Sequence, residues 1–385
     1  MLSLTEIALR HPGGTTPIVA GRGALAAAAE RLAEWLRGRA VFVVTTPRVL
    51  RLHGDRIGRL AGAAARRVDL EVPEGEGAKR LEVAGRLWER LLAEGGKRDS
   101  RLVAFGGGSV GDLGGFVAGC FLRGIEYVQL PTTLLAQVDA AIGGKTAVDL
   151  PAAKNSVGLF HDPAAVFADA DVLATLPAEE LRSGLAEVVK VALLLDPGLL
   201  ARVERDLPEL LAGEPEALEP VVAAAAALKV RIVESDPREG DRRRLLNLGH
   251  TQGHALESAL GYRGLRHGEA VAYGILFAVR LAEARGPGWL RPAVAERVRA
   301  LFARMELPPL PAGGLDPDDL VRRMQHDKKA REGGLAWVLP ASAEGDDPEA
   351  VEGRVVADVE PALVRRELAG FLGAPLGYTR SRLGA

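Results

Sequence analysis

Side chains that can bind a metal ion gather in the second half of the chain. Three of the seven histidines, His250, His254 and His267, fall within 18 residues. Glu187 lies in a separate apolar segment, one helical turn before Lys190. A carboxylate with two imidazoles is a set that holds zinc and leaves positions open for water or substrate. The pattern favours a catalytic metal site over three unrelated surface histidines.

The spacing of these residues predicts how helices would present them. Asn247, His250 and His254 are spaced i, i+3 and i+7, which places them on one face of a helix. His267 stands at the expected start of the next helix. The two histidines do not form the motif of a zinc protease, because Thr251 stands where those enzymes carry glutamate.

A glycine-rich turn in the first half predicts a nucleotide site. Gly106, Gly108 and Gly111 satisfy G-x-G-x-x-G between an expected strand, residues 101–105, and an expected helix. In that context the glycines let the backbone approach a pyrophosphate at the positive N-terminus of the helix. A tight turn that only packs the helix on the strand is the alternative, and Asp112 then simply complements the helix dipole.

Scarce residue types point to a second polar segment. Only 8 of the 49 basic residues are lysine, and the chain has two asparagines. Residues 131–155 hold Asp139, Lys145, Lys154 and Asn155 among small and apolar residues. Glycines beside lysine suit a loop wrapped round an anion, whereas an ordinary solvated loop is the alternative.

Charge and composition exclude several classes of function. The 49 basic and 51 acidic residues leave a net charge of −2, which excludes a global basic field for nucleic acid. An anionic ligand therefore needs local cations, and the remaining candidates are Arg123, Lys229, Arg243, Lys328 and Lys329. A single cysteine, Cys120, fits a reducing cytoplasm. We expect no membrane partner, because no apolar run reaches the length of a membrane span.

Alternating patterns predict the elements that position these residues. Residues 1–176 alternate β-branched runs with amphipathic stretches, which indicates a parallel α/β domain. Expected strands cover residues 40–45, 101–105 and 126–130, with helices over 23–36 and 82–92. Residues 177–373 read as a mainly helical domain, before a loose tail at 374–385. The expected helices of this second domain cover 181–195, 220–233, 249–260, 269–284 and 292–305, with a short strand at 335–339.

Five long motifs closely resemble the 3-dehydroquinate synthase family. They are GGGSVGDLGGFVA, RGIEYVQLPTTLLAQVDAAIGGKTAVDLPAAKN, LRSGLAEVVK, RLLNLGHTQGHALE and LRHGEAV, in the family's order over roughly residues 70–340. The resemblance implies a Rossmann-like α/β NAD-binding domain followed by a mainly α-helical metal-binding domain. It also implies a cytoplasmic, homodimeric lyase of the shikimate pathway, dependent on NAD and a divalent metal, usually zinc and sometimes cobalt. Its substrate would be 3-deoxy-D-arabino-heptulosonate 7-phosphate, and its products 3-dehydroquinate and phosphate.

The resemblance also assigns roles to individual residues. It implies metal ligands at Glu187, His250 and His267, with His254 beside the metal as a proton-handling group. Implied NAD contacts are Glu74, Gly75, Glu76, Gly77, Ala78, Lys79, Gly108, Ser109, Val110, Gly111, Asp112, Thr132, Thr133, Asp139, Lys145, Lys154, Val172, Leu173, Ala174 and Thr175. Implied substrate contacts are Lys145, Asn155, Lys190, Lys229, Arg243, Asn247, His254 and one of Lys328 and Lys329. Arg123 would reach the phosphate from the partner subunit.

Three departures from the family pattern and three rival functions remain. Ser109-Val110 replaces two aliphatic residues, Gln252 stands where phenylalanine is usual, and Thr46 replaces an acidic residue or asparagine near the adenosine.

The rival functions are a sister sugar-phosphate cyclase such as a valiolone or deoxy-inosose synthase, a metal-dependent polyol dehydrogenase, and a non-catalytic NAD-binding module. The positions that would face substrate match the dehydroquinate synthases, which favours that family.

Overall fold

The computed structural model describes residues 4–151, 153–240, 242–311, 314–326, 335–344 and 349–375. The chain folds into two compact units, and neither is one continuous segment. The sheet unit comprises Met1–Leu181 with Ala212–Pro237, and the helical unit comprises Arg182–Leu211 with Arg238–Ala385. The chain therefore leaves the sheet unit, returns to it for one long helix and leaves it again. The domain limits expected from sequence, at 176/177 and 373/374, stay predictions.

The sheet unit is built on seven strands in the order β1-β2-β9-β6-β5-β3-β4. Their bounds are β1 (Thr5–His11), β2 (Gly14–Gly21), β3 (Ala40–Thr45), β4 (Arg66–Glu71), β5 (Arg101–Gly106), β6 (Tyr127–Pro131) and β9 (Val166–Asp169). All neighbours pair in parallel except β1 and β2, which form an antiparallel hairpin at the edge. Strands β5 and β6 are buried along their whole length, as expected for a parallel sheet covered on both faces.

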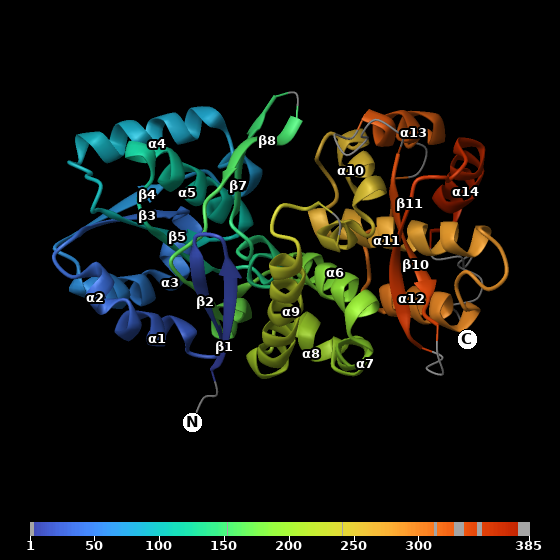
Figure 1. Cartoon of the computed structure of the whole chain (residues 1–385), viewed down its shortest axis with the longest axis horizontal. Coiled ribbons are helices and arrows are strands. Elements are labelled where there is room, and N and C mark those ends of the chain that lie inside the picture. Colours follow the sequence, from blue (N-terminus) through green and yellow to red (C-terminus); the bar gives the residue numbers. More distant parts are fainter. Residues whose placement is uncertain are drawn as a thin grey trace. The chain divides into compact units, whose positions relative to one another are not determined.

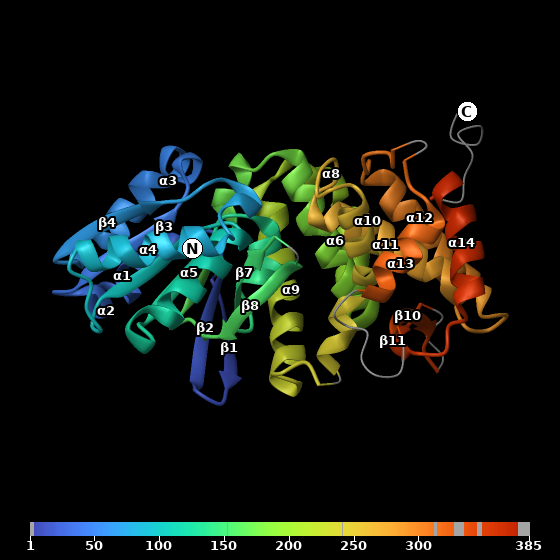
Figure 2. The same cartoon turned by 90° about the horizontal axis from the view of Figure 1, so that it is seen from above.

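Helices cover the two faces of this sheet (Figure 1). One face carries α1 (Ala24–Arg31), α2 (Ala33–Leu36) and α3 (Pro47–Leu60), and the other carries α4 (Leu81–Ala93) and α5 (Gly108–Cys120). A core of buried apolar side chains joins α4 and α5 to the sheet, including Leu87, Leu113 and Phe42. The long helix α9 (Pro215–Ser235) packs beside β1 and β2 in both Figure 1 and Figure 2. This packing explains why α9 belongs to the sheet unit.

The segment expected to be a loop round an anion is mostly regular structure. Residues after β6 form one π-helical turn, η4 (Ala136–Ala140), and then an antiparallel hairpin of β7 (Lys145–Leu150) and β8 (Ala153–Phe160). The expectation of a loop is therefore wrong for most of its length. The hairpin packs closely on α5, because a Cβ on Gly119 would lie 2.5 Å from a methyl carbon of Leu159.

The helical unit gathers its helices round α11. Its elements are α6 (Ala178–Leu195, entered from the sheet unit), α7 (Pro197–Arg205), α8 (Leu207–Ala212), α10 (His250–Ala259), α11 (His267–Ala284), α12 (Pro292–Arg304), α13 (Pro317–His326), α14 (Pro361–Gly373) and the hairpin of β10 (Trp337–Ser342) and β11 (Val351–Val356). Nearly all of α11 is buried. Phe277 of α11 contacts the rings of Trp337 and Phe371, with centroids 5.8 and 5.4 Å apart.

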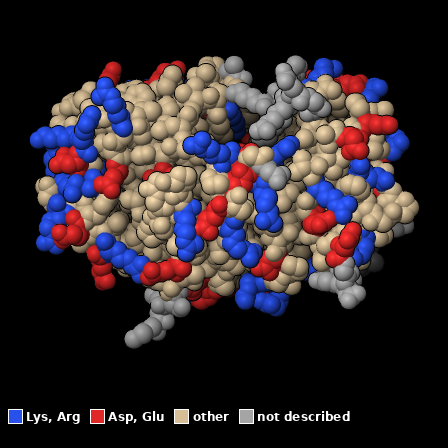
Figure 3. Space-filling view, viewed as in Figure 1, with Lys and Arg blue, Asp and Glu red and all other residues tan. Residues whose placement is uncertain are grey.

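The fold class expected from sequence is confirmed: a mixed α/β domain precedes a mainly helical one. The sheet is mixed rather than wholly parallel, because β1 runs antiparallel. No helix in the described part of the chain is both long and apolar enough to cross a membrane. On the face drawn in Figure 3, basic and acidic side chains are intermixed. Binding of an anion must therefore depend on particular clusters of cations.

Candidate functional site

Glycines let three segments of the helical unit approach one another closely. A Cβ on Gly268, in the first turn of α11, would collide with the backbone carbonyl of Ser183 on α6. A Cβ on Gly274 would collide in the same way with the backbone of Gly249, just before α10. Only glycine fits at these two points. As a result, the helix that carries Glu187 touches the start of the helix that carries His267.

Polar contacts hold the start of α11 against α6. Glu269 accepts a hydrogen bond from the backbone N–H of Arg266 at 2.8 Å, and its other oxygen pairs with Arg182 of α6 at 3.1 Å. The hydroxyl of Ser183 accepts from the N–H of Gly268 at 2.9 Å. The helix begins at His267, two residues before the start expected from the sequence, and its first turn is held against α6.

Asn247 does not share a helix with the two histidines, which corrects one expectation. It ends a 3-10 helix, η6 (Arg242–Asn247), and α10 begins at His250. Gly249 lies between them in the left-handed region, with φ of 79°, so a single α-helix cannot run through it. His250 and His254 do lie together on α10, with ring centroids 5.4 Å apart. Asn247 instead donates to Glu239 Oε1 at 2.9 Å.

Glu187, His250 and His267 converge on one point. Oε1 of Glu187 lies 3.8 Å from Nε2 of His250 and 3.7 Å from Nε2 of His267. A tetrahedral zinc ion separates its ligand atoms by about 3.3–3.4 Å at the usual bond lengths. The three ligand atoms are therefore slightly further apart than in a closed zinc site and near enough to share one ion.

The surroundings of Glu187 fit a bound cation. The residue is 1% exposed, and no described donor makes a hydrogen bond to either of its carboxylate oxygens. Lys190, also 1% exposed, forms an ion pair with Oε2 that lies outside hydrogen-bond geometry. A buried carboxylate is costly unless charge or hydrogen bonds compensate it. The carboxylate therefore has unused capacity on the side that faces the two imidazoles.

The orientation of His250 also suits a ligand. Its Nδ1 lies 3.2 Å from the backbone oxygen of Leu248. A proton on Nδ1 would make this hydrogen bond and leave the lone pair of Nε2 directed at Glu187. The ring of His254 lies 5.9 Å from that of His267, so this histidine stands beside the set.

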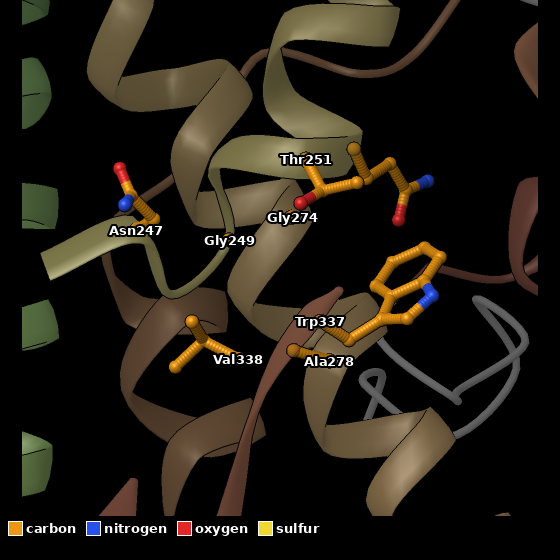
Figure 4. A pocket seen from close by; sticks show the side chains of 8 residues that line it. Asn247, Gly249, Thr251, Gly274, Ala278, Trp337 and Val338 are labelled. Atoms are coloured by element: carbon orange, nitrogen blue, oxygen red, sulfur yellow. The ribbon is translucent and has the colours of Figure 1, made fainter. Parts of the chain in front are cut away.

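A small cavity of about 10 Å³, which is about the space that one water molecule needs, lies among α10, α11 and β10. Figure 4 labels residues that line it: Asn247 and Gly249 from the segment that leads into α10, Thr251 from α10, Gly274 and Ala278 from α11, and Trp337 and Val338 from β10. Gln252 also lines it and is 1% exposed, and neither of its amide atoms has a hydrogen-bond partner among the described residues. The departure from phenylalanine at this position therefore places a buried amide beside this cavity.

In the sheet unit, the glycine turn has the context that the sequence predicts. Strand β5 ends at Gly106, and α5 begins at Gly108. Packing explains part of the glycine pattern, because a Cβ on Gly106 would lie 2.7 Å from the side chain of Val110. A Cβ on Gly107 would lie 3.0 Å from Thr133, in the segment after β6. The turn therefore combines tight packing with a helix N-terminus.

A network of charges lies beside this turn. Lys79 pairs with Asp112 Oδ2 at 2.6 Å and hydrogen-bonds Asn155 Oδ1. Ser109 donates to Glu76, of the 3-10 turn η2 (Gly75–Gly77), at 3.3 Å. Burial opposes the charge on Lys79, but the carboxylates of Asp112 and Glu76 outweigh burial and raise the pKa of its ammonium group. Five residues expected at the cofactor and substrate sites are thus neighbours.

A second ion pair in the sheet unit joins Lys229 of α9 to Asp139 of η4. Lys229 is 7% exposed. Lys145 begins β7 and Lys154 lies on β8, so both belong to the hairpin. Residues Val172–Thr175 lie in the 3-10 helix η5 (Ala170–Thr175) that follows β9.

The remaining predicted residues are placed as follows. Glu74 accepts from the backbone N–H of Arg48 at 3.2 Å. Arg123 ends a 3-10 turn, η3 (Phe121–Arg123), with φ of 70°. Arg243 is 2% exposed within η6. Lys328 and Lys329 lie outside the described residues.

Sequence reasoning missed several carboxylates that contact candidate residues, among them Asp149, which accepts from the backbone N–H of Asn155 at 2.6 Å. Glu257 lies 3.2 Å from Nδ1 of His267, and Glu239 accepts from Asn247. Glu257 follows His254 by three residues, so its helical spacing could have revealed it. Glu239 has no comparable signal in the sequence.

Comparisons with known proteins show the family of this chain. Two family models match in succession, 3-dehydroquinate synthase N-terminal over residues 69–183 and 3-dehydroquinate synthase C-terminal over 184–330. The 3-dehydroquinate synthase of Symbiobacterium thermophilum is 44% identical over 84% of this chain and 90% of its own.

Two solved structures share the fold. One is ValA, a 2-epi-5-epi-valiolone synthase from Streptomyces hygroscopicus subsp. jinggangensis 5008 with NAD+ and Zn2+ bound, with a TM-score of 0.82 and 29% identity over 93% of this chain and 96% of that one. The other is a 2-deoxy-scyllo-inosose synthase complexed with carbaglucose-6-phosphate, NAD+ and Co2+, with a TM-score of 0.80 and 25% identity over 96% and 99%. With the curated relative and both family models, these matches show that the chain belongs to the 3-dehydroquinate synthase family.

Proposed function

We propose that this protein converts 3-deoxy-D-arabino-heptulosonate 7-phosphate into 3-dehydroquinate and phosphate, with NAD and a divalent metal ion as cofactors. The observation that carries the proposal is the convergence of Glu187, His250 and His267 in a chain 44% identical to a named 3-dehydroquinate synthase. The two structural relatives bind NAD+ with Zn2+ or Co2+, which supports zinc or cobalt here.

The cofactors would supply a reversible hydride acceptor and a Lewis acid for the substrate hydroxyls. The chain's own residues would then bind and orient the substrate. Little of this chemistry needs a strong protein base, and the candidate residues are rich in fixed charge and hydrogen-bond donors instead.

We assign the substrate carboxylate to Lys229 and Arg243. The planar guanidinium of Arg243 can bond both carboxylate oxygens. Lys229 already pairs with Asp139, so a substrate carboxylate would share or displace that partner. The phosphate would be held by Lys145, Asn155 and one of Lys328 and Lys329. Lys190, Asn247 and His254 would contact the substrate near the metal.

The proposal includes a cytoplasmic homodimer in which Arg123 reaches the partner's phosphate. Leu122 and Arg123 both have positive φ, 51° and 70°, and this unusual turn would fix the direction of the arginine. Sedimentation at several protein concentrations would test the dimer, and a monomer at all of them would contradict it.

The most direct test supplies the heptulosonate phosphate with catalytic NAD and zinc. We expect inorganic phosphate and 3-dehydroquinate in equal amounts. A different cyclised product would indicate a sister sugar-phosphate cyclase, and net reduction of NAD by a polyol without phosphate release would indicate a dehydrogenase. Protein stripped of metal by a chelator should lose turnover and regain it with zinc or cobalt.

Variants of the two proposed carboxylate ligands test the substrate site. Lys229→Ala and Arg243→Ala should each cost about 2–4 kcal/mol of transition-state stabilisation in kcat/KM, because each removes a buried charge that pairs with the substrate. Lys97→Ala is the matched control, since this lysine is exposed and lies outside the proposed site. Near-normal kcat/KM in both site variants would mean that the carboxylate binds elsewhere.

A further inference from the structure

The two nitrogens of the His267 ring face two different carboxylates. Nε2 lies 3.7 Å from Glu187, and Nδ1 lies 3.2 Å from Oε2 of Glu257. Glu257 is 5% exposed on α10, whereas His267 begins α11. The buried carboxylate of Glu257 therefore links α10 to the first residue of α11. The resemblance to known synthases did not assign Glu257 any role.

We propose that Glu257 is a positioning residue that makes His267 a metal ligand, an inference that rests on the proposed metal site. A hydrogen bond from Nδ1–H to Glu257 fixes the tautomer in which Nε2 carries a lone pair. It also fixes the rotation of the ring, so that this lone pair points at the space shared with Glu187 and His250. A carboxylate behind a ligating imidazole raises the basicity of the ligand as well.

The two histidines of the set differ in how they are held. His250 has a neutral backbone carbonyl, that of Leu248, at 3.2 Å from Nδ1. For His267, the buried carboxylate of Glu257 lies at the same distance from Nδ1. Charge-assisted hydrogen bonds are about twice as strong as neutral ones. In addition, 35% of the His267 side chain is exposed against 12% for His250, so packing restrains it less. Glu257 therefore supplies restraint where the packing does not.

The same side chains could be read as a second metal site, because His254, Glu257 and His267 also bring ligand atoms within 4.8 Å of one another. Two ions would then require His267 to lose both ring protons and bridge them. A single ion with Nδ1–H donated to Glu257 needs no such deprotonation. The inference therefore predicts one zinc ion per chain.

Two variants separate charge from shape at this position. Glu257→Gln keeps the length of the side chain and an oxygen that can accept from Nδ1–H, but removes the charge. Glu257→Leu removes the acceptor as well. We expect zinc affinity to fall in the order wild type, Gln, Leu, with a total loss of about 10- to 100-fold, the range found for removing such outer partners.

Zinc affinity is measured on the metal-stripped full-length protein by competition with a chromogenic chelator, together with the zinc content per chain. Asp162→Asn is the matched control, because Asp162 contacts Nδ1 of His11 at 2.9 Å in the sheet unit. That variant removes the same kind of carboxylate–imidazole contact and should leave zinc affinity unchanged.

A spectroscopic readout excludes a merely structural role. In metal-free protein with 15N-labelled histidine at about pH 8.5, where imidazole is neutral, His267 should be the Nδ1–H tautomer. It should become a mixture of tautomers in Glu257→Leu and stay mostly Nδ1–H in Glu257→Gln. A wild-type tautomer and affinity in the Leu variant would overturn the inference while leaving the metal site intact. Two zinc ions per chain would also overturn it, and a wild type that binds no zinc would overturn the metal site itself.

Discussion

Two buried carboxylates, Asp169 in the sheet unit and Glu187 in the helical unit, are compensated in different ways. In the sheet unit, Asp169 is fully buried and accepts backbone hydrogen bonds from Gly23, Leu25 and Asp171 at 3.0–3.1 Å, while Arg56 pairs with it at 3.2 Å. In the helical unit, Glu187 is equally buried, yet no described donor hydrogen-bonds its oxygens.

The difference shows which of the two carboxylates a bound ligand could still compensate. Folding alone supplies fixed backbone dipoles and paired side chains to the aspartates of the sheet unit. Folding supplies Glu187 with an adjacent lysine and two imidazoles whose Nε2 atoms face it. Such a set is best compensated by a cation, because the desolvation of a carboxylate costs several kcal/mol unless it is offset.

The largest expected effect concerns the close approach of α6 and α11. Gly268→Ala would force a methyl group into the backbone of Ser183, and we expect the free energy of unfolding to fall by about 3 kcal/mol. Zinc affinity should fall too, since Glu187 and His267 sit on these two helices. Gly85→Ala in α4 is the control, because open space surrounds that position. It should stabilise the protein by about 0.5–1 kcal/mol in urea unfolding. Equal stabilities for the two variants would contradict the argument.

Zinc should stabilise the protein through Glu187. At a free zinc concentration about 100 times Kd, the free energy of unfolding should rise by about 2.7 kcal/mol, because the ion binds only the folded state. Glu187→Gln should lose most of this gain. Glu204→Gln should keep it, since Glu204 is already paired with Arg297 at 2.7 Å in the same unit. Thermal unfolding with and without zinc measures both, and an unchanged shift in Glu187→Gln would argue against the site.

The ion pair between Lys229 and Asp139 in the sheet unit should contribute to stability independently of zinc. Asp139→Asn leaves the buried ammonium of Lys229 without its carboxylate and should cost about 2 kcal/mol of unfolding free energy. The double variant with Lys229→Met should recover much of the loss, because it removes both charges. Urea unfolding with and without zinc should give the same differences. If these differences in unfolding free energy depended on zinc, the ion pair in the sheet unit would not be independent of the metal site, which would contradict the prediction.

The smallest expected effect is a gain in stability in the helical unit. Gln252→Leu removes a buried amide that has no hydrogen-bond partner among the described residues, so the free energy of unfolding should rise by about 1 kcal/mol. Gln129→Leu is a matched contrast, because its buried amide contacts the hydroxyl of Tyr127 at 3.4 Å. That change should not stabilise the protein. A loss of stability in Gln252→Leu would show that the amide is satisfied in solution.

Much of the fold followed from local patterns. The buried run at β3 and the strand before the glycine turn at β5 were predicted within one residue, because continuous β-branched and apolar residues identify buried strands. The long helix α11 was predicted to begin two residues later than it does. The edge hairpin of β1 and β2 was missed, because its alternation is weak and its partner strand β9 lies far along the chain.

The candidate site, like the fold, could be predicted from the sequence only in part. Residue types and spacing alone identified a carboxylate and imidazoles suited to a metal, a glycine turn between strand and helix, and the scarce lysines that could hold an anion. The break before α10 escaped notice, because only the backbone conformation of Gly249 separates Asn247 from the helix. Glu257 escaped notice because its contact with His267 depends on how α10 packs against α11. The chemical type of each side chain can be read directly from the sequence. Which atoms come into contact depends on how closely the helices approach one another, and Gly268 and Gly274 allow that close approach here.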